Sequence, residues 1–167
     1  MRVYLPSTLR DVAGLLAKGE AAPTPLHCFA VTPALREAYA SGDDEELEYV
    51  AMLTAARQSL RLLADDADSP RRRVVLAVDV PEREVSWHAY DDEPSAVIVS
   101  ATIPMSAVVS GHVDVPEASE DVAAAADAIG AADAGDEDAA FTVDSAEGHE
   151  LAWYATQELH DIPNGRG

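Results

Sequence analysis

The amino-acid sequence predicts an α+β domain in which a mixed β-sheet is flanked by helices. Three observations lead to this fold class. Apolar residues recur at helical spacing in four segments, and apolar or alternating runs of strand length lie between them. One of these runs, Val74–Val78, is almost continuously apolar, which is typical of a central strand buried on both faces. The third observation is a pattern that occurs near both ends of the chain.

This repeated pattern joins a strand, a proline and a helix. Val3-x-Leu5-Pro6 followed by Asp11-Val12-Ala13 recurs 110 positions later as Val113-x-Val115-Pro116 followed by Asp121-Val122-Ala123. Chance is one explanation in a chain so rich in alanine and valine. The other is two strand–helix–strand halves, as in a ferredoxin-like split-βαβ sheet with helices on one face and residues 33–64 and 74–103 inserted. A three-layer α/β sandwich is the alternative fold, and residues 1–167 form a single domain in either case.

Local signals place the elements of the first half. Ser7 or Thr8 can cap the first helix, and Gly19 ends it. The longest helix carries four acidic residues in its first turn and two arginines near its end, which suits the helix dipole. The expected order is strand 2–5, closed by Pro6, the capped helix, strand 26–31, a short helix from Pro33 to about Ser41, helix 43–64 and strand 74–78.

The second half continues with strands 85–90, 96–103 and 108–113, helix 117–132 and a loop at 134–138. Residues 151–159 fit either a strand or a helix, and we choose a strand because the fold requires one. The stretch from Pro94 to Val113 contains no charged side chain, and its 20 residues match the length of a membrane span. Their prolines and their alternating pattern predict buried sheet instead, so we expect no membrane segment.

The charge is distributed unevenly along the chain. Of 31 acidic and 11 basic residues, 13 acidic and 10 basic lie in residues 1–83, against 18 acidic and one basic, Arg166, in residues 84–167. The second half therefore carries a net charge of −17 out of a total of −20. Such a surface repels phosphate backbones, which excludes nucleic acid as its partner. The single cysteine, Cys28, excludes a disulfide framework, and the first residues carry no signal peptide, so we expect a cytoplasmic protein.

Several segments resemble an uncharacterised actinobacterial family of about this length. They are the opening Met-Arg-Val-Tyr-Leu-Pro, Ala30-Val-Thr-Pro-Ala-Leu-Arg-Glu37, Glu45-Glu-Leu-Glu-Tyr49, Arg71-Arg-Arg-Val-Val-Leu-Ala77 and Trp153-Tyr-Ala-Thr-Gln-Glu158. The resemblance extends from end to end. It implies a cytoplasmic bacterial protein and no particular activity.

Candidate catalytic residues lie at two strand ends that share the sequence Val-Asp-Val-Pro-Glu, at residues 78–82 and 113–117. Asp79 and Asp114 would end strands, where open α/β sheets bind ligands. His112 and Asp114 share one face of a strand and could hold a metal ion or a proton between them, with His149 as a further ligand or general base. Turn formation or helix capping by each aspartate is the simpler explanation. Nearby carboxylates would raise the pKa of such a histidine.

Other residues are weaker candidates. The acidic loop with Asp133, Asp136 and Asp138 could bind a divalent cation. However, its sixth position lacks the glycine of a calcium loop, and a solvated acidic loop is the better explanation. We predict no cofactor. The arginines Arg71, Arg72 and Arg73 could contact an anion, a partner or nearby aspartates, including those of a second subunit. Cys28 is expected to be buried and inert, and the aromatic pairs Trp87-His88 and Trp153-Tyr154 to pack in the core.

Two function classes remain. The first is a non-enzymatic cytoplasmic module that binds a ligand or another protein, with a basic protein as the partner that the acidic half would attract and a homodimer as a further alternative. The second is a small metal-assisted hydrolase that uses His112, Asp114 and Asp79. The absence of phosphate-binding, nucleophile-elbow and Cys-x-x-Cys motifs favours the first class without deciding whether the protein is an enzyme.

Overall fold

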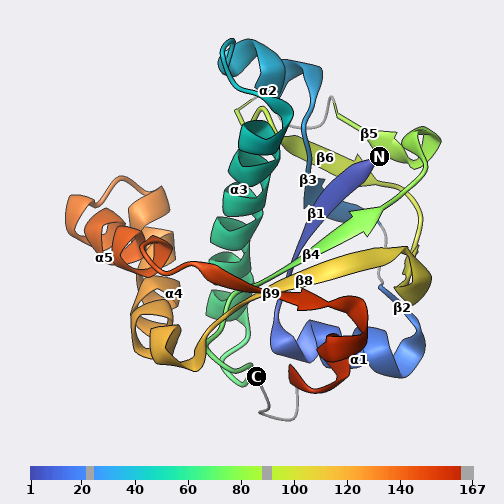
Figure 1. Cartoon of the computed structure of the whole chain (residues 1–167). Helices are drawn as coiled ribbons and strands as arrows, with labels where there is room; N and C mark the ends of the chain where they lie inside the picture. The colour runs from blue at the N-terminus through green and yellow to red at the C-terminus, as the bar shows by residue number, and fades with distance from the viewer. Residues whose placement is uncertain (22–24, 88–91, 163–167) are drawn as a thin grey trace.

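The computed structural model of the chain describes residues 1–21, 25–87 and 92–162 and confirms the α+β prediction (Figure 1). The strands are β1 (Arg2–Ser7), β2 (Glu20–Ala21), β3 (Leu26–Phe29), β4 (Val74–Asp79), β5 (Val85–Ser86), β6 (Ala96–Val99), β7 (Ile103–Pro104), β8 (Val108–Asp114) and β9 (Leu151–Ala155). The helices are α1 (Leu9–Lys18), α2 (Pro33–Ala38), α3 (Asp44–Asp65), α4 (Ser119–Asp133) and α5 (Glu137–Glu147).

Seven strands form one sheet in the order β5-β6-β3-β1-β4-β8-β9, and every pair within the described ranges is antiparallel. The split-βαβ arrangement differs, because the two strands of each such unit run parallel with another strand between them. Here the strands that are joined across helices, β1 with β3 and β8 with β9, are antiparallel neighbours. β1 and β8, which carry the repeated pattern, run parallel to each other on either side of β4. A second, two-stranded sheet joins β2 to β7.

The sheet is covered on both faces, which matches the layering of the three-layer alternative. Successive residues of β4 point to opposite sides. Val74, Leu76 and Val78 pack in the cluster that contains the apolar face of α1, whereas Val75 and Ala77 pack with α3. These five residues are almost completely buried, as expected for the central strand.

Helices α1 and α3 begin where the sequence places them. Thr8, and not Ser7, caps α1: its hydroxyl accepts a hydrogen bond from the Asp11 amide, and the Asp11 carboxylate accepts one from the Thr8 amide. The Asp43 carboxylate caps α3 by accepting one hydrogen bond from the Glu46 amide. Within α3, the buried Ser59 hydroxyl donates to the Ser7 carbonyl (2.7 Å) and accepts from the Val74 amide (3.1 Å). This hydroxyl therefore fixes α3 across the ends of β1 and β4.

The second half contains a helix that the sequence pattern does not predict. Helix 117–132 is confirmed as α4, preceded by a short 3-10 turn, but α5 starts inside the expected loop at 134–138 and runs on to Glu147. Of its side chains, only Val143 and Ala146 are fully buried. Its apolar periodicity is weak because α5 packs on α4 and not on the sheet, and Figure 1 shows the pair to one side of α3.

The remaining expectations concern strands. Residues 151–155 form β9, followed by a 3-10 turn at Thr156–His160, so the choice of a strand is confirmed for the first five positions. The stretch from Pro94 to Val113 forms β6, β7 and most of β8. No helix in the described part of the chain has the length and apolar character that a membrane span requires. β1 continues through Pro6 to Ser7, and positions 88–90 of the expected strand 85–90 lie outside the described residues.

Two glycines are expected to respond in opposite ways to replacement by alanine. A Cβ at Gly14 in α1 would meet no atom within 4 Å, whereas one at Gly111 in β8 would lie 2.5 Å from a methyl group of the buried Leu159. Gly14→Ala should therefore raise the free energy of unfolding by about 0.5–1 kcal/mol through helix propensity. Gly111→Ala should lower it by about 1–3 kcal/mol through overpacking.

Urea unfolding of the two single variants and the wild type measures both effects. The Gly14 variant serves as the control for the loss of backbone freedom in the unfolded chain, which both substitutions share. A Gly111→Ala variant as stable as the Gly14→Ala variant would show that Leu159 does not pack against β8 as described.

Candidate functional site

The structure separates the two aspartates of the predicted catalytic set. Asp79 pairs with Arg2 at one end of β4, and Asp114 lies beside Arg73 at the other end. Six residue steps along the strand, from Arg73 to Asp79, separate these ends, which corresponds to about 20 Å. One metal ion cannot reach both carboxylates. The hypothesis of a metal-assisted hydrolase required Asp79, Asp114 and His112 to converge, and these positions do not converge.

Asp114 forms a buried ion pair. Its carboxylate accepts two hydrogen bonds from the Arg73 guanidinium, from Nε to Oδ2 and from Nη2 to Oδ1, each 2.8 Å long. The Arg73 amide donates a third bond to Oδ2. Both side chains are almost completely buried. The Asp114 carboxylate is therefore fully used inside the fold and cannot also bind a metal ion or a substrate.

His112 lies on the same face of β8 as Asp114, as predicted, but the two side chains have different partners. The Ser110 hydroxyl lies 3.3 Å from Nε2 of the His112 ring, whereas Asp114 bonds to Arg73. Burial lowers the pKa of His112, whereas we expected neighbouring carboxylates to raise it. The difference arises because Asp114 is turned toward Arg73. Ser110 is a neighbour that sequence analysis missed, although its spacing of two residues from His112 places it on the same face.

His149 and the acidic loop also have local partners. The ring of His149 lies 2.7 Å from the Asp121 carboxylate. Asp133 accepts two hydrogen bonds from Arg61, which lowers the pKa of Asp133, and Asp136 caps α5 through the Ala139 amide. Asp138 lies in the first turn of α5. No group of three metal-ligating side chains occurs within residues 1–21, 25–87 and 92–162.

The three consecutive arginines bind backbone carbonyl groups as well as Asp114. Arg71 donates to the carbonyls of Leu63 and Asp66, and Arg72 donates to that of Asp114. Arg73 reaches the carbonyls of Ala146 and His149, both at 3.0 Å. The expected contact of these arginines with an anion or a partner stays a prediction, since their hydrogen bonds lie within this chain.

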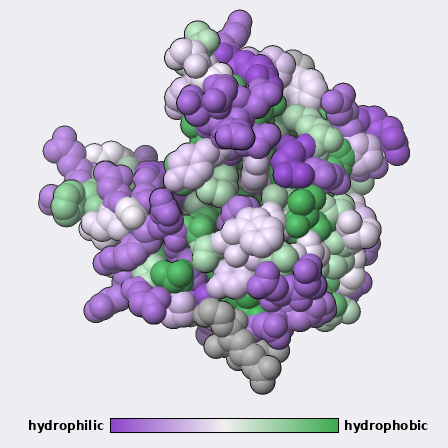
Figure 2. All heavy atoms as spheres, viewed as in Figure 1, coloured by the Kyte–Doolittle hydropathy of each residue, from purple (hydrophilic) through white to green (hydrophobic). Residues whose placement is uncertain are grey.

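Most of the basic side chains form hydrogen bonds or ion pairs within the chain. Eight of the 11 Lys and Arg residues bond to a carboxylate or to the backbone through the guanidinium: Arg2, Arg10, Arg36, Arg57, Arg61, Arg71, Arg72 and Arg73. The segment 117–150, which contains α4 and α5, has 11 acidic residues and no Lys or Arg. We call this segment the acidic hairpin. Figure 2 shows a largely hydrophilic surface on the lobe that it forms.

A large apolar side chain stands on this acidic surface. Phe141 of α5 is 74% exposed, the most exposed of the large hydrophobic residues that the structure describes. Glu137, Asp138 and Asp144 lie four or three positions away along the helix and are exposed too, so they surround the ring on the same face. Sequence analysis missed Phe141 because it assigned no element to residues 139–149.

A second exposed aromatic residue corrects an expectation. Trp153, expected in the core, is 62% exposed. It lies opposite His112 on β9, the last strand of the sheet, whereas α3 packs against β1, β3 and β4. Tyr154 and Trp87 are partly buried against the core cluster, as expected, and His88 lies outside the described residues.

Cys28 is buried, as predicted. Burial raises the pKa of its thiol to about 12, so the thiolate is not formed at neutral pH. It faces the apolar cluster beneath α1, together with Leu5 and Leu15. A protonated thiol in such surroundings neither attacks a substrate nor binds a metal ion.

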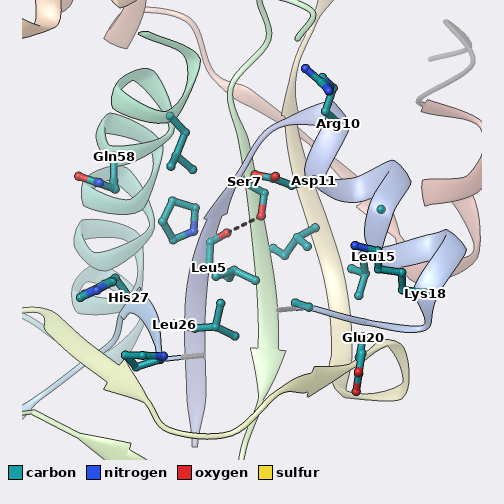
Figure 3. Close-up of a pocket in the computed structure, with 16 residues that line it drawn as sticks. Leu5, Ser7, Arg10, Asp11, Leu15, Lys18, Glu20, Leu26, His27 and Gln58 are labelled. Carbon is teal, nitrogen blue, oxygen red and sulfur yellow. Dashed lines mark hydrogen bonds between the residues drawn. The ribbon is translucent and has the colours of Figure 1, made fainter. Parts of the chain in front are cut away.

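A pocket of about 500 Å³ opens between β1, β3, α1 and α3 (Figure 3). Pro6 explains its position. Met1 and Val80 exchange backbone hydrogen bonds. By alternation, the backbone N–H and C=O groups of the even-numbered residues of β1 point toward β3. Pro6 has no N–H to give there, and β1 pairs with β3 only at Tyr4. The two strands separate beyond this point and leave the pocket.

The pocket combines an apolar floor with a charged rim. Leu5, Leu26 and Leu76 line it, while Arg10 and Lys18 lie on its rim together with Asp11 and Glu20. Charges of both signs give the rim no net preference. The pocket has the size of a small-molecule site but identifies no ligand class.

Removing one partner of the buried ion pair should destabilise the protein strongly. Asp114→Asn leaves the Arg73 guanidinium buried without its counter-charge, and we expect a loss of about 3–5 kcal/mol in the free energy of unfolding. Asp133→Asn, which breaks a partly exposed pair with Arg61, is the control and should cost no more than about 1 kcal/mol. Urea unfolding measures both, and equal losses would contradict the buried pair.

His112 should make stability depend on pH. Because its pKa in the folded protein lies below the usual 6.5, the unfolded chain binds the proton first as the pH falls. The contribution to stability is present above about pH 6.5 and is lost below it. His112→Gln, which can still contact Ser110, should lose less stability than the wild type between about pH 7.5 and pH 5.5. Parallel losses in urea unfolding would rule out His112 as the group responsible.

Comparison with known proteins agrees with the end-to-end resemblance seen in the sequence. The model of a family of unknown function (DUF6912) matches residues 1–162. No curated protein and no solved structure matched the chain. The matched region contains the whole sheet, both of its helical layers and the acidic hairpin. The chain therefore belongs to the family of unknown function DUF6912.

Proposed function

We propose that this protein is a non-enzymatic binding module whose acidic hairpin binds a basic protein partner. The observation that carries the proposal is the hairpin surface: 11 acidic residues, no Lys or Arg, and an exposed phenylalanine among the carboxylates. The negative charge attracts a cationic partner over a distance, and the aromatic ring offers it an apolar contact. An acidic surface that only faced solvent would not require such a ring.

The arginines support this proposal by their position. Because eight of the 11 cations already bond to carboxylates or to the backbone, few are left to neutralise the remaining acidic side chains. Arg57 and Arg61 each engage one carboxylate of the hairpin, Glu147 and Asp133. In the described part of the chain, no Lys or Arg forms an ion pair with the carboxylates beside Phe141, those of Glu137, Asp138 and Asp144. A field of one sign speeds the approach of an oppositely charged partner, and this rate falls as salt is added.

Phe141 provides an exposed apolar contact in the middle of the acidic surface. An isolated exposed apolar residue is common on protein surfaces. Here, however, the ring stands within one helical turn of three carboxylates, Glu137, Asp138 and Asp144. This arrangement fits a partner that places lysines or arginines around an apolar contact, and a guanidinium can also stack on the ring. The expected partner is therefore a cationic, amphipathic protein segment.

The alternatives have less support. The hydrolase hypothesis lacks a place where its residues meet, since Asp114 is held by Arg73 and Asp79 by Arg2. A homodimer through the acidic half would bring two surfaces of the same sign together. We place the binding role in the cytoplasm, because a single buried cysteine suits a reducing compartment.

The test uses a synthetic helix of leucine and lysine at amphipathic spacing as the probe, with affinity measured by calorimetry at low and physiological salt. Binding should weaken as salt is added. Phe141→Ser should weaken it about tenfold, the loss of about 1.4 kcal/mol expected for a central aromatic contact. Phe141→Leu, which keeps an apolar contact, should bind more tightly than Phe141→Ser.

A charge-matched pair of variants separates a site from general attraction. Glu137→Gln/Asp144→Asn removes two charges beside Phe141, and Glu37→Gln/Glu82→Gln removes two exposed charges elsewhere. We expect the first to weaken binding and the second to leave it within about twofold. Equal weakening by both, or affinity indifferent to salt, would overturn the proposal.

A further inference from the structure

The direction of the backbone hydrogen bonds in β9 follows from those in β8. The Asp114 amide donates a hydrogen bond to the Arg73 carbonyl (3.0 Å). The backbone N–H and C=O groups of residues 110, 112 and 114 therefore point toward β4, and those of Gly111 and Val113 point toward β9. Their partners on β9 are Tyr154 and Ala152. By alternation, the N–H and C=O groups of residues 151, 153 and 155 point away from the sheet.

This outer edge is open along most of its length. β9 is the last strand in the sheet order, and in the described part of the chain no strand pairs with its far side. Among the outward amides of β9, that of Ala155 donates a hydrogen bond to the Glu158 carboxylate (3.0 Å), and within residues 1–21, 25–87 and 92–162 those of Leu151 and Trp153 have no such partner. Leu151 and Trp153 therefore present two donors and two acceptors to an incoming strand.

The usual protections of a sheet edge are missing here. β9 contains no charge, no proline and no shift of register against β8. The opposite edge, β5, is protected by its length of two residues, whereas β9 pairs over five. Native edge strands that lack a charge, a proline, a bulge or a cover are templates for further strand pairing.

We propose that the outer edge of β9 binds an extended segment of a partner protein, which adds an eighth strand to the sheet. The inference rests on the proposed function in that the partner is basic. Glu150 precedes the strand and Glu158 follows it, and both are exposed. A segment with an uncharged centre and a Lys or Arg at each end therefore complements this edge.

The exposed Trp153 ring adds side-chain contact. It stands on the face of the sheet that α3 covers farther inward, next to where the added strand would lie. Cross-strand pairs with an aromatic residue stabilise a sheet by about 0.2–1 kcal/mol each. A second copy of the chain is a poorer occupant, because antiparallel pairing about Trp153 would place the Glu150 of one copy near the Glu158 of the other.

The probe is the peptide Lys-Arg-Thr-Val-Thr-Val-Thr-Arg-Lys, compared with the same peptide N-methylated at its five central residues. Amide hydrogen exchange followed by NMR is the readout. With the first peptide, exchange of the Leu151 and Trp153 amides should slow at least tenfold, while the Ala152 and Tyr154 amides, already bonded to β8, should change little. The methylated peptide has the same charge and should produce no such slowing.

Two variants test the edge from the side of the protein. Trp153→Pro removes the outward N–H without removing a hydrogen bond to β8, and should abolish the slowing at Leu151. Trp153→Ala keeps that N–H and should retain it with reduced affinity. Exchange at Ala152 and Tyr154 in the free variants shows whether β9 still pairs with β8.

The outcomes separate this inference from the proposed function. If cationic probes bind through the hairpin while Leu151 and Trp153 exchange freely with the peptide, the edge proposal fails and the basic-partner function stands. If neither the helical nor the extended probe binds, both fail. If the two amides slow as the protein itself is concentrated and its mass doubles, the occupant is a second copy, which overturns the assignment to a basic partner.

Discussion

The buried contact between Arg73 and Asp114 holds the two halves of the molecule together. Burying two charges is costly unless every donor and acceptor has a partner. Here the carboxylate receives three hydrogen bonds from Arg73, and the guanidinium also reaches two carbonyls at the end of α5 and just beyond it. One side chain thus fixes β8 beside β4 and fixes where α5 ends. The acidic hairpin and β9, which lie on either side of that point, take their positions from it.

The same contact explains how a chain with a charge of −20 folds around an ordinary core. Arginine is the better cation for this purpose, since its planar group bonds carboxylates and carbonyls in fixed directions. Arg57, Arg61 and Arg73 each join the first half of the chain to an acidic residue of the second. Repulsion among the remaining carboxylates is left on the surface, where solvent and salt screen it. The acidic coat is thus separate from the forces that hold the sheet together.

Local signals predicted much of the fold, whereas the candidate site depended on contacts between distant residues. The sequence predicts α1, α3 and β4 from Thr8, Asp43 and a continuous apolar run. Helix caps and strand burial depend on residues only a few positions apart, so a local pattern reveals them. The two Val-Asp-Val-Pro-Glu segments suggested one site, but β4 and β8 are antiparallel, so equivalent positions must lie at opposite ends of the sheet. The sequence pattern does not predict helix α5, because this helix packs on another helix and buries few residues. The exposure of Trp153 depends on strand order, which no local pattern contains.

The geometry also links the two proposed surfaces. Only residues 148–150 separate α5 from β9, and Arg73 binds the carbonyls of Ala146, in the last turn of α5, and of His149, within this junction. The hairpin and the strand edge are therefore held in a fixed relation, without a flexible linker between them. A partner that carries a cationic helix followed by an extended segment would gain from both contacts, because the second forms within one complex at a high effective concentration. Such a partner needs only moderate affinity for each surface, which is what a short uncharged edge and one exposed aromatic ring can supply.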